Sequence, residues 1–134
     1  MAPSSPFLFD ASALPTSPVV VAEVPPGIRA KEALFAELAQ GLHFPDYFGF
    51  NWDALWDCIR DLSWLPVGPI VLKHSDLPLA ADPASLKTYL AILRDTAEKR
   101  WSGSREHDLI VFFPPETQER VVWVLRSAKR DEDT

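Results

Sequence analysis

The sequence has little of several residue types, and each shortage excludes a class of protein. A single cysteine, Cys58, has no partner for an internal disulfide and is too few for a multi-cysteine zinc site. There is no run of about eighteen consecutive apolar residues, and the first residues lack the basic region of a cleaved signal. We therefore expect a cytoplasmic protein that does not associate with membranes.

Positive charge and catalytic motifs are also scarce. Thirteen Lys and Arg face nineteen Asp and Glu, which gives a net charge of -6 and a pI near 4.9. Nucleic acids and anionic lipids are poor partners for such a chain, whereas a basic protein would be steered toward it. The chain has no Gly-rich phosphate loop or CxxC motif, and His43, His74 and His107 do not have metal-ligand spacing. We predict no catalytic residues, no metal and no cofactor.

Apolar residues make up 47% of the 134 residues, enough for one domain with a core. Residues 1–18 are rich in Pro and Ser and are predicted to form a loosely attached arm, with 7–11 as a candidate short edge strand. Residues 19–127 form the predicted domain. The charged residues 128–134 are expected to be a mobile tail.

Short apolar runs at 19–24, 70–73 and 109–113 predict buried strands. Because these runs are continuous rather than alternating, they favour a three-stranded parallel sheet that is covered on both faces. The segment RVVWVLR at 120–126 is predicted as a fourth strand at the sheet edge. A monomer is expected, and an exposed edge at 120–126 would offer a route to a dimer.

Helical periodicity separates the predicted strands. Residues 31–42 and 51–62 each predict a helix, the second with Asn51 as its N-cap, and Asp82-Pro83 starts a third that continues to Trp101. The predicted fold class is therefore a small α/β layer in which right-handed crossovers connect parallel strands and helices pack against them.

The second helix combines residues that do not pack together easily. Asp53, Asp57 and Asp61 lie four positions apart and form one row of like charges, with Trp52 and Trp56 beside it. The row suits a solvated face, a Mg²⁺ site in an enzyme, or a surface for a basic partner. Spacing alone favours core over interface for the tryptophans.

The loop before this helix is also rich in aromatic residues and contains a further acidic residue. HFPDYFGF, residues 43–50, adds aromatic side chains and Asp46, and Gly49 is expected to allow a turn that other residues resist. Residues 44–64 contain four Asp and one Arg, with no Lys or Glu, so half of the net charge lies in one sixth of the chain.

This segment, FPDYFGFNWDALWDCIRDL, resembles the motif of the barstar family of ribonuclease inhibitors, which partner barnase. The likeness covers about fifteen positions without a gap and carries the family assignment. Residues that coincide with the motif are Pro45, Tyr47, Gly49, Asn51, Asp53, Ala54, Leu55, Trp56, Asp57 and Cys58.

The resemblance implies a barstar-like fold and an inhibitor, not an enzyme, that blocks the basic active site of a barnase-type secreted ribonuclease or another toxin nuclease. Asp57 would take the place of a substrate phosphate and Asp53 would pair with a further cation. Tyr47 would pack against the catalytic base, and Asp95 stands where the family has a Glu contact. Further partner-binding residues implied are Gly49, Asn51, Trp52 and Trp56.

Some features depart from the family. Trp52 stands where barstar has an aliphatic residue, and DLSWLPVG after the second helix differs in length and sequence, which leaves Leu62 and Trp64 unassigned as contacts. The arm, the insert 100–108 and the segment 120–126 are additional. The alternatives to a ribonuclease inhibitor are an acidic binding module for another basic protein and a Mg²⁺-dependent enzyme that uses the aspartate row.

Overall fold

The computed structural model describes residues 6–99 and 107–132. The elements, in chain order, are η1 (Ala11–Ala13), β1 (Val20–Val24), α1 (Lys31–Gly41), α2 (Trp52–Asp61), β2 (Gly68–His74), α3 (Pro83–Lys99), β3 (His107–Phe112), η2 (Pro115–Thr117) and α4 (Gln118–Glu132). The expected end of the third helix at Trp101 and most of the insert 100–108 lie outside the described residues.

The three predicted strands form one parallel sheet, as expected, and the structure gives its strand order as β1-β2-β3. Ala22 in β1 pairs in register with Leu72 in β2, and Leu72 pairs with Val111 in β3. Each connection between neighbouring strands contains a helix, because parallel strands cannot be joined by a tight turn. The predicted α/β class with helices packed on a three-stranded parallel sheet is confirmed.

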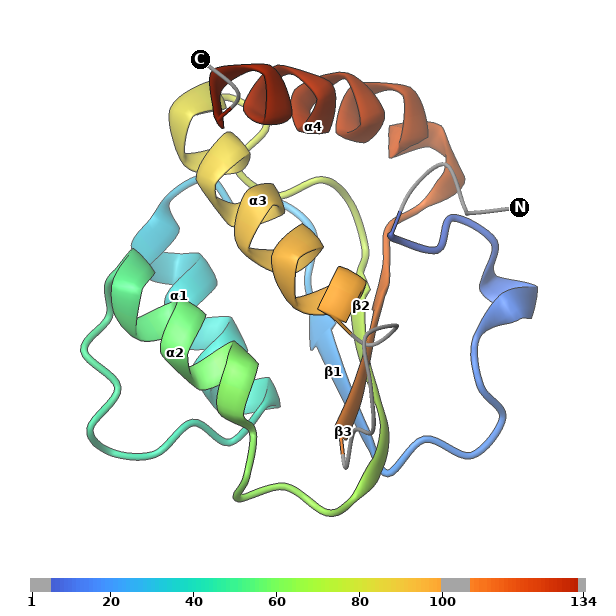
Figure 1. Ribbon diagram of the computed structural model, residues 1–134, viewed down its shortest axis with the longest axis vertical. Coiled ribbons are helices and arrows are strands. Elements are labelled where there is room, and N and C mark those ends of the chain that lie inside the picture. Colours follow the sequence, from blue (N-terminus) through green and yellow to red (C-terminus); the bar gives the residue numbers. More distant parts are fainter. Residues whose placement is uncertain (1–5, 100–106, 133–134) are drawn as a thin grey trace.

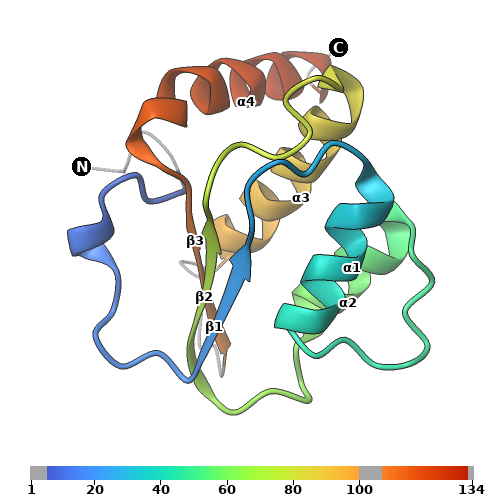
Figure 2. The ribbon, with the colours of Figure 1, turned by 180° about the vertical axis from the view of Figure 1, so that it is seen from behind.

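Helices α1, α2 and α3 lie on one side of the sheet, and the N-terminal arm lies on the other (Figures 1 and 2). On the helix side α1 approaches β1 closely, since a Cβ at Gly41 would stand 2.9 Å from the Cβ of Ala22. On the other side Val71 of β2 and Ile110 of β3 are buried, whereas Val21 of β1 is exposed. The central strand is therefore covered on both faces, but β1 is covered on one.

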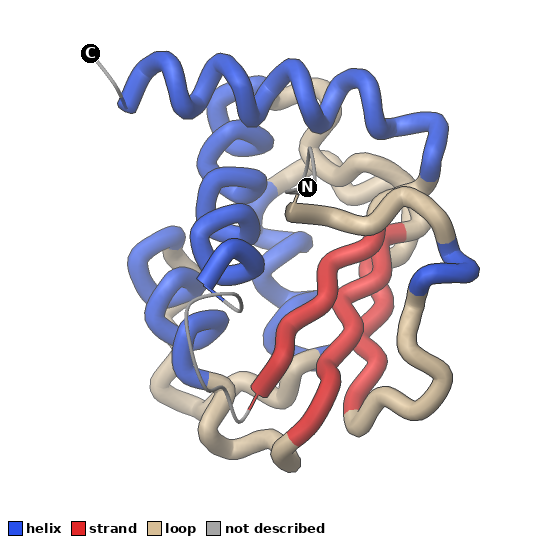
Figure 3. The backbone as a smooth tube through the Cα atoms, turned by 45° about the vertical axis from the view of Figure 1, so that its right-hand side comes forward, coloured by secondary structure: helices blue, strands red, loops and turns tan. Residues whose placement is uncertain are grey.

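The prediction of a fourth strand at 120–126 is wrong, because these residues belong to α4. The helix crosses one end of the sheet beside α3 (Figures 1 and 3). Its buried residues recur with helical spacing, and tertiary packing on this stripe overrides the strand preference of a segment rich in β-branched residues. The buried residues are Val121, Val124, Leu125 and Ala128.

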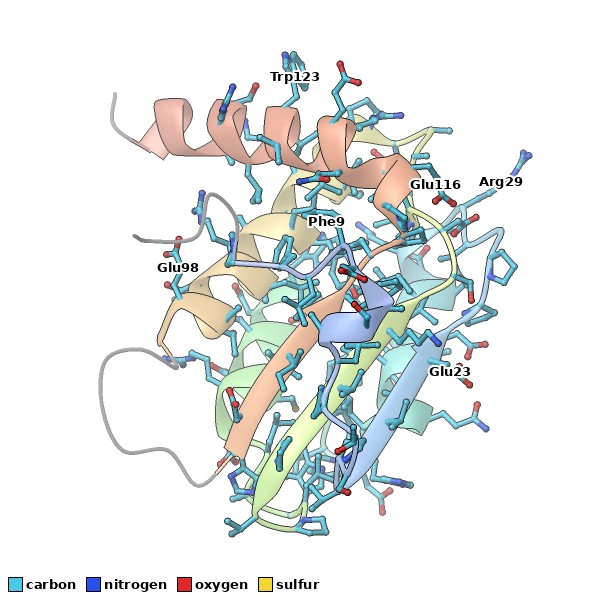
Figure 4. The ribbon with its side chains drawn as sticks, turned by 90° about the vertical axis from the view of Figure 1, so that its right-hand side faces the viewer. Phe9, Glu23, Arg29, Glu98, Glu116 and Trp123 are labelled. Atoms are coloured by element: carbon cyan, nitrogen blue, oxygen red, sulfur yellow. The ribbon has the colours of Figure 1, made fainter. Side chains whose placement is uncertain are left out.

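This correction extends to both ends of the segment. Residues 128–132, expected to be part of a mobile tail, continue α4, while 133 and 134 lie outside the described residues. Trp123 is 68% exposed and points away from the protein (Figure 4). Because residues 120–126 form part of a helix, they cannot provide the edge strand that was expected as a route to a dimer.

The described part of the arm, from residue 6 onward, pairs with the outer edge of β3 through an isolated bridge. The backbone N–H of Leu8 donates to Val111 (2.8 Å), and that of Phe113 donates to Leu8 (3.0 Å), which forms a single parallel bridge between Leu8 and Phe112. Phe7 is buried and its ring centroid lies 5.3 Å from that of Phe113. The candidate strand at 7–11 is thus one bridge followed by the turn η1.

A buried polar group joins β2, β3 and α3. Nδ1 of His74 lies 2.8 Å from the carbonyl oxygen of Phe112, and Nε2 lies 2.7 Å from the hydroxyl of Tyr89. A carbonyl can only accept, so Nδ1 donates and the Tyr89 hydroxyl donates to Nε2. The ring also stacks on Phe113 at 4.0 Å. Burial lowers the pKa of His74 to about 4, against the opposing effect of the Phe112 hydrogen bond.

Candidate functional site

Helix α2 starts at the predicted cap. The Asn51 Oδ1 accepts a hydrogen bond from the backbone N–H of Ala54 (2.8 Å), and its Nδ2 donates to the carbonyl of Gly49 (3.2 Å). The side chain satisfies one otherwise unpaired N–H of the first turn and also holds the preceding loop. Asn51 therefore positions both parts of the predicted surface.

The turn before the helix differs from the expectation for Gly49. The left-handed conformation belongs to Phe50, with a φ of 50°, and not to Gly49. A Cβ at Gly49 would stand 3.2 Å from the Nδ2 of Asn51, so the glycine provides room for the capping side chain. A non-glycine residue at positive φ is uncommon and is a form of local strain that gathers at functional sites.

One face of α2 is part of the core. Leu55, Cys58 and Ile59 are buried, and the helix is followed by its C-cap Leu62, which is also buried and has a φ of 52°. The pKa of Cys58 is raised, first by burial and then by Asp57 and Asp61 nearby. A buried thiol with a raised pKa is a poor nucleophile, so Cys58 packs as a small apolar residue.

The two tryptophans of α2 have different environments. Trp52 is half-buried and packs edge-on against Phe35, with ring centroids 4.9 Å apart. Trp56 is 39% exposed, and its Nε1–H donates to the Oδ2 of Asp95 on α3 (3.1 Å). Trp52 thus contributes mainly to the core, whereas Trp56 borders the surface and is held from the neighbouring helix.

The row of aspartates lies on the exposed face of α2. Asp53, Asp57 and Asp61 are all exposed, and Asp57 accepts a hydrogen bond from the Nη2 of Arg60 at 2.9 Å. The guanidinium of Arg60 also stands 4.5 Å from the centroid of the Trp56 ring. Within the part of the chain that the structure describes, no cation pairs with Asp53 or Asp61.

The loop 43–50, which precedes α2, carries both buried and exposed aromatic side chains. It leaves the end of α1 and passes along the outer side of the helices before α2 begins (Figures 1 and 2). Phe48 is buried, and its ring lies 5.0 Å from that of Phe50, which is 52% exposed. Tyr47 is 74% exposed. We call the loop 43–50 together with the exposed face of α2 the binding surface.

The structure brings the eight predicted site residues to one region, since Asp95 of α3 meets Trp56 of α2. Phe50 and Arg60 belong to the same surface but were not among the predicted residues. The charge of Arg60 beside the aspartate row was a usable signal, whereas the left-handed backbone of Phe50 cannot be read from the sequence.

Two residues left unassigned as contacts lie elsewhere. Leu62 is in the core, and Trp64 donates its Nε1–H to the carbonyl of Leu42 (2.9 Å), which ties the end of α2 to the end of α1.

The exposed side chains of this surface are carboxylates and aromatic rings. Among the described residues, no group of three or more His, Cys, Asp or Glu is arranged to hold a metal ion. Exposed carboxylates beside exposed aromatic rings are suited to a partner that presents cations in a hydrophobic setting, because charges add specificity and aromatic rings add buried area. The fold and these exposed residues define an α/β domain with an acidic, aromatic candidate site for a protein partner.

Comparison with known proteins identifies the family. The sequence model of the family described as "Barstar (barnase inhibitor)" matches residues 20–114, so the chain belongs to the barstar family. That description is of an inhibitor, not of an enzyme, so it gives no support to the Mg²⁺-dependent enzyme considered from the sequence. The match ends at residue 114, and α4 follows it.

One curated relative is consistent with this assignment. The chain is 49% identical over 43 residues to a protein of Bacillus subtilis (strain 168) named "Putative ribonuclease inhibitor YrdF". The aligned part is 32% of this chain and 46% of the relative, so it spans less than half the length of that protein. Among the described residues, no helix is both long and apolar enough to cross a membrane.

Proposed function

We propose that this protein is a cytoplasmic, monomeric inhibitor that blocks the basic active site of a barnase-type secreted ribonuclease through its binding surface. Family membership supports a ribonuclease as the partner, and the relative's name points the same way. The observation that carries the proposal is the exposed row Asp53, Asp57 and Asp61 on α2, together with the exposed rings of Trp56 on the same helix and Tyr47 in the loop before it.

The roles within the surface follow from charge and position. Asp57 lies in the second turn of α2 and would occupy the place of a substrate phosphate among the enzyme's cations. Asp53, one turn earlier and without a counter-ion among the described residues, would pair with a further cation. Burying these charges costs desolvation free energy, which is offset only when the partner's cations lie close to them. The surface would therefore select for a basic active site.

The remaining residues would shape the contact. Tyr47 is the most exposed ring of the surface and would pack against the catalytic base of the ribonuclease. Asn51 and Gly49 hold the loop against the start of α2, and the half-buried Trp52 packs against Phe35 of α1. Asp95 would contribute through its own carboxylate and through the orientation of Trp56.

Titration into barnase tests the proposal, with cleavage of a fluorogenic RNA as the readout. We expect inhibition at one equivalent and an association rate that falls as salt rises from low to moderate concentration, because steering between opposite charges is screened. Full ribonuclease activity at excess protein would exclude barnase as a target. Binding without inhibition would favour an acidic binding module for another basic protein.

A further inference from the structure

Arg60 is the basic side chain of the binding surface, and it is already engaged in the unbound protein. Its guanidinium donates to Asp57 at 2.9 Å and lies 4.5 Å from the centroid of the Trp56 ring. Arg60 and Asp57 are one helical turn apart, so the pair forms without a change in the backbone. The carboxylate with the central role in the proposed function therefore has an internal counter-ion.

The ring beneath Arg60 is held by a second helix. The Nε1–H of Trp56 donates to Asp95 on α3 at 3.1 Å, which fixes the ring relative to the helix pair. A fixed aromatic face attracts a guanidinium, since the ring carries negative charge density on its face. Asp95, Trp56, Arg60 and Asp57 thus form a chain of contacts, which we call the surface cluster, that keeps Arg60 over Asp57.

We propose that Arg60 is a specificity-determining residue that guards Asp57, so that a partner reaches this carboxylate only by displacing the Arg60 guanidinium. This proposal rests on the proposed function and deepens it. A partner arginine, which can bind a carboxylate through two parallel N–H donors, competes better for Asp57 than a lysine, which acts as a point charge. The guard therefore favours partners whose active site presents arginine.

Removal of the guard should make Asp57 easier to reach. We expect Arg60→Gln to bind barnase about fivefold more tightly than the wild type, the factor expected for the loss of one exposed ion pair and one cation–π contact in the unbound state. Arg29→Gln is the matched control, because it removes the same charge from an exposed side chain that points away from the protein (Figure 4).

Surface plasmon resonance with immobilised barnase compares the two variants with the wild type at two salt concentrations. A gain for Arg60→Gln that exceeds the gain for Arg29→Gln supports the guard. Equal gains would mean that only net charge matters, and weaker binding by Arg60→Gln would mean that Arg60 contacts the partner directly. Either of these results overturns the proposal.

A second probe keeps the test independent of the ribonuclease. Calorimetric titration with an oligoarginine and an oligolysine peptide of equal length should show that the wild type prefers oligoarginine, and that Arg60→Gln gains affinity for both and loses part of the preference. If the wild type fails to bind barnase, the proposed target is wrong, but the peptides still decide the role of Arg60. Identical peptide binding by Arg60→Gln and Arg29→Gln would refute the guard.

Discussion

Two polar clusters in this protein each combine titratable side chains with aromatic rings, one inside the domain and one on its surface. The core cluster consists of His74, Tyr89, Phe113 and the Phe112 carbonyl, and its polar groups are fully buried and paired. The surface cluster consists of Trp56, Asp57, Arg60 and Asp95, and the Asp57 side chain is 71% exposed.

Because the two clusters differ in burial, we expect them to have different roles. A buried hydrogen bond is costly to break, because the group left behind loses both its partner and water. An exposed ion pair contributes little to stability, since water can replace either partner. The core cluster should therefore control the stability of the fold, while the surface cluster leaves its charges available to another protein.

The largest expected effect is on binding and comes from Asp57→Ala. If Asp57 faces the buried cations of a ribonuclease, its loss leaves them unpaired and weakens binding by about 3–5 kcal/mol. The free energy of unfolding should change by no more than about 0.5 kcal/mol, because the site is on the surface. Binding to barnase by calorimetry and urea unfolding by circular dichroism measure the two quantities.

Glu23→Ala is the control for this variant. Glu23 is an exposed acid on β1, where the open face of the sheet lies opposite the helices (Figure 4). Glu23→Ala should leave the affinity nearly unchanged. Equal affinities for Asp57→Ala and the wild type would remove Asp57 from the interface.

The next effect is on stability and comes from His74. Its pKa is about 4 in the native protein and 6.5 without burial, so between these values the unfolded chain binds a proton that the native protein does not. The stability that depends on a neutral His74 is fully present above pH 6.5. The free energy of unfolding then decreases as the pH falls toward about 4. The loss is about 3 kcal/mol, because each pKa unit corresponds to ~1.4 kcal/mol.

Urea unfolding between pH 7 and 4.5 measures this loss, and NMR of the His74 ring gives its titration directly. His43→Gln, which changes an exposed histidine, should keep the same dependence on pH. A His74 ring that titrates near pH 6.5 in the folded protein would contradict the assignment.

A smaller loss of stability is expected for Tyr89→Phe. The change removes the hydroxyl that donates to the Nε2 of His74 and leaves this nitrogen buried without a donor, which costs about 1–3 kcal/mol. Affinity for a partner should not change, since Tyr89 is fully buried. Chemical denaturation measures the loss of stability, and calorimetry measures affinity for the partner; Asp57→Ala should show the opposite result in both. If Tyr89→Phe lost affinity without losing stability, the two clusters would not have the separate roles proposed.

The smallest effect is expected for Asn51→Ala. Asn51 contributes to stability as the cap of α2 and to binding as a contact of the preceding loop. Loss of the N-cap of α2 should lower the free energy of unfolding by about 1 kcal/mol. It should also loosen the loop through the lost hydrogen bond to Gly49 and reduce affinity modestly. Asn51→Asp keeps a capping oxygen and should restore stability but not the loop contact. Full affinity in Asn51→Ala would show that the loop is held by other contacts.

Much of the fold could be predicted because local signals agreed with the tertiary structure. The apolar runs became the strands, and Asn51 marked the start of α2, since a capping side chain acts within its own turn. The segment 120–126 could not be assigned in the same way. Its branched residues suit a strand as well as a helix, and burial of Val121, Val124 and Leu125 beside α3 decided for the helix.

For the candidate site, the sequence by itself determined the row Asp53, Asp57 and Asp61, because residues four apart lie on one face of any helix. Only the tertiary structure decided which tryptophan of α2 packs in the core and which borders the surface. Trp52 meets Phe35 of α1 and Trp56 meets Asp95 of α3, and neither contact follows from spacing within α2. Which face of a helix is covered depends on elements that are distant in the chain, whereas which residues share that face depends only on the helix.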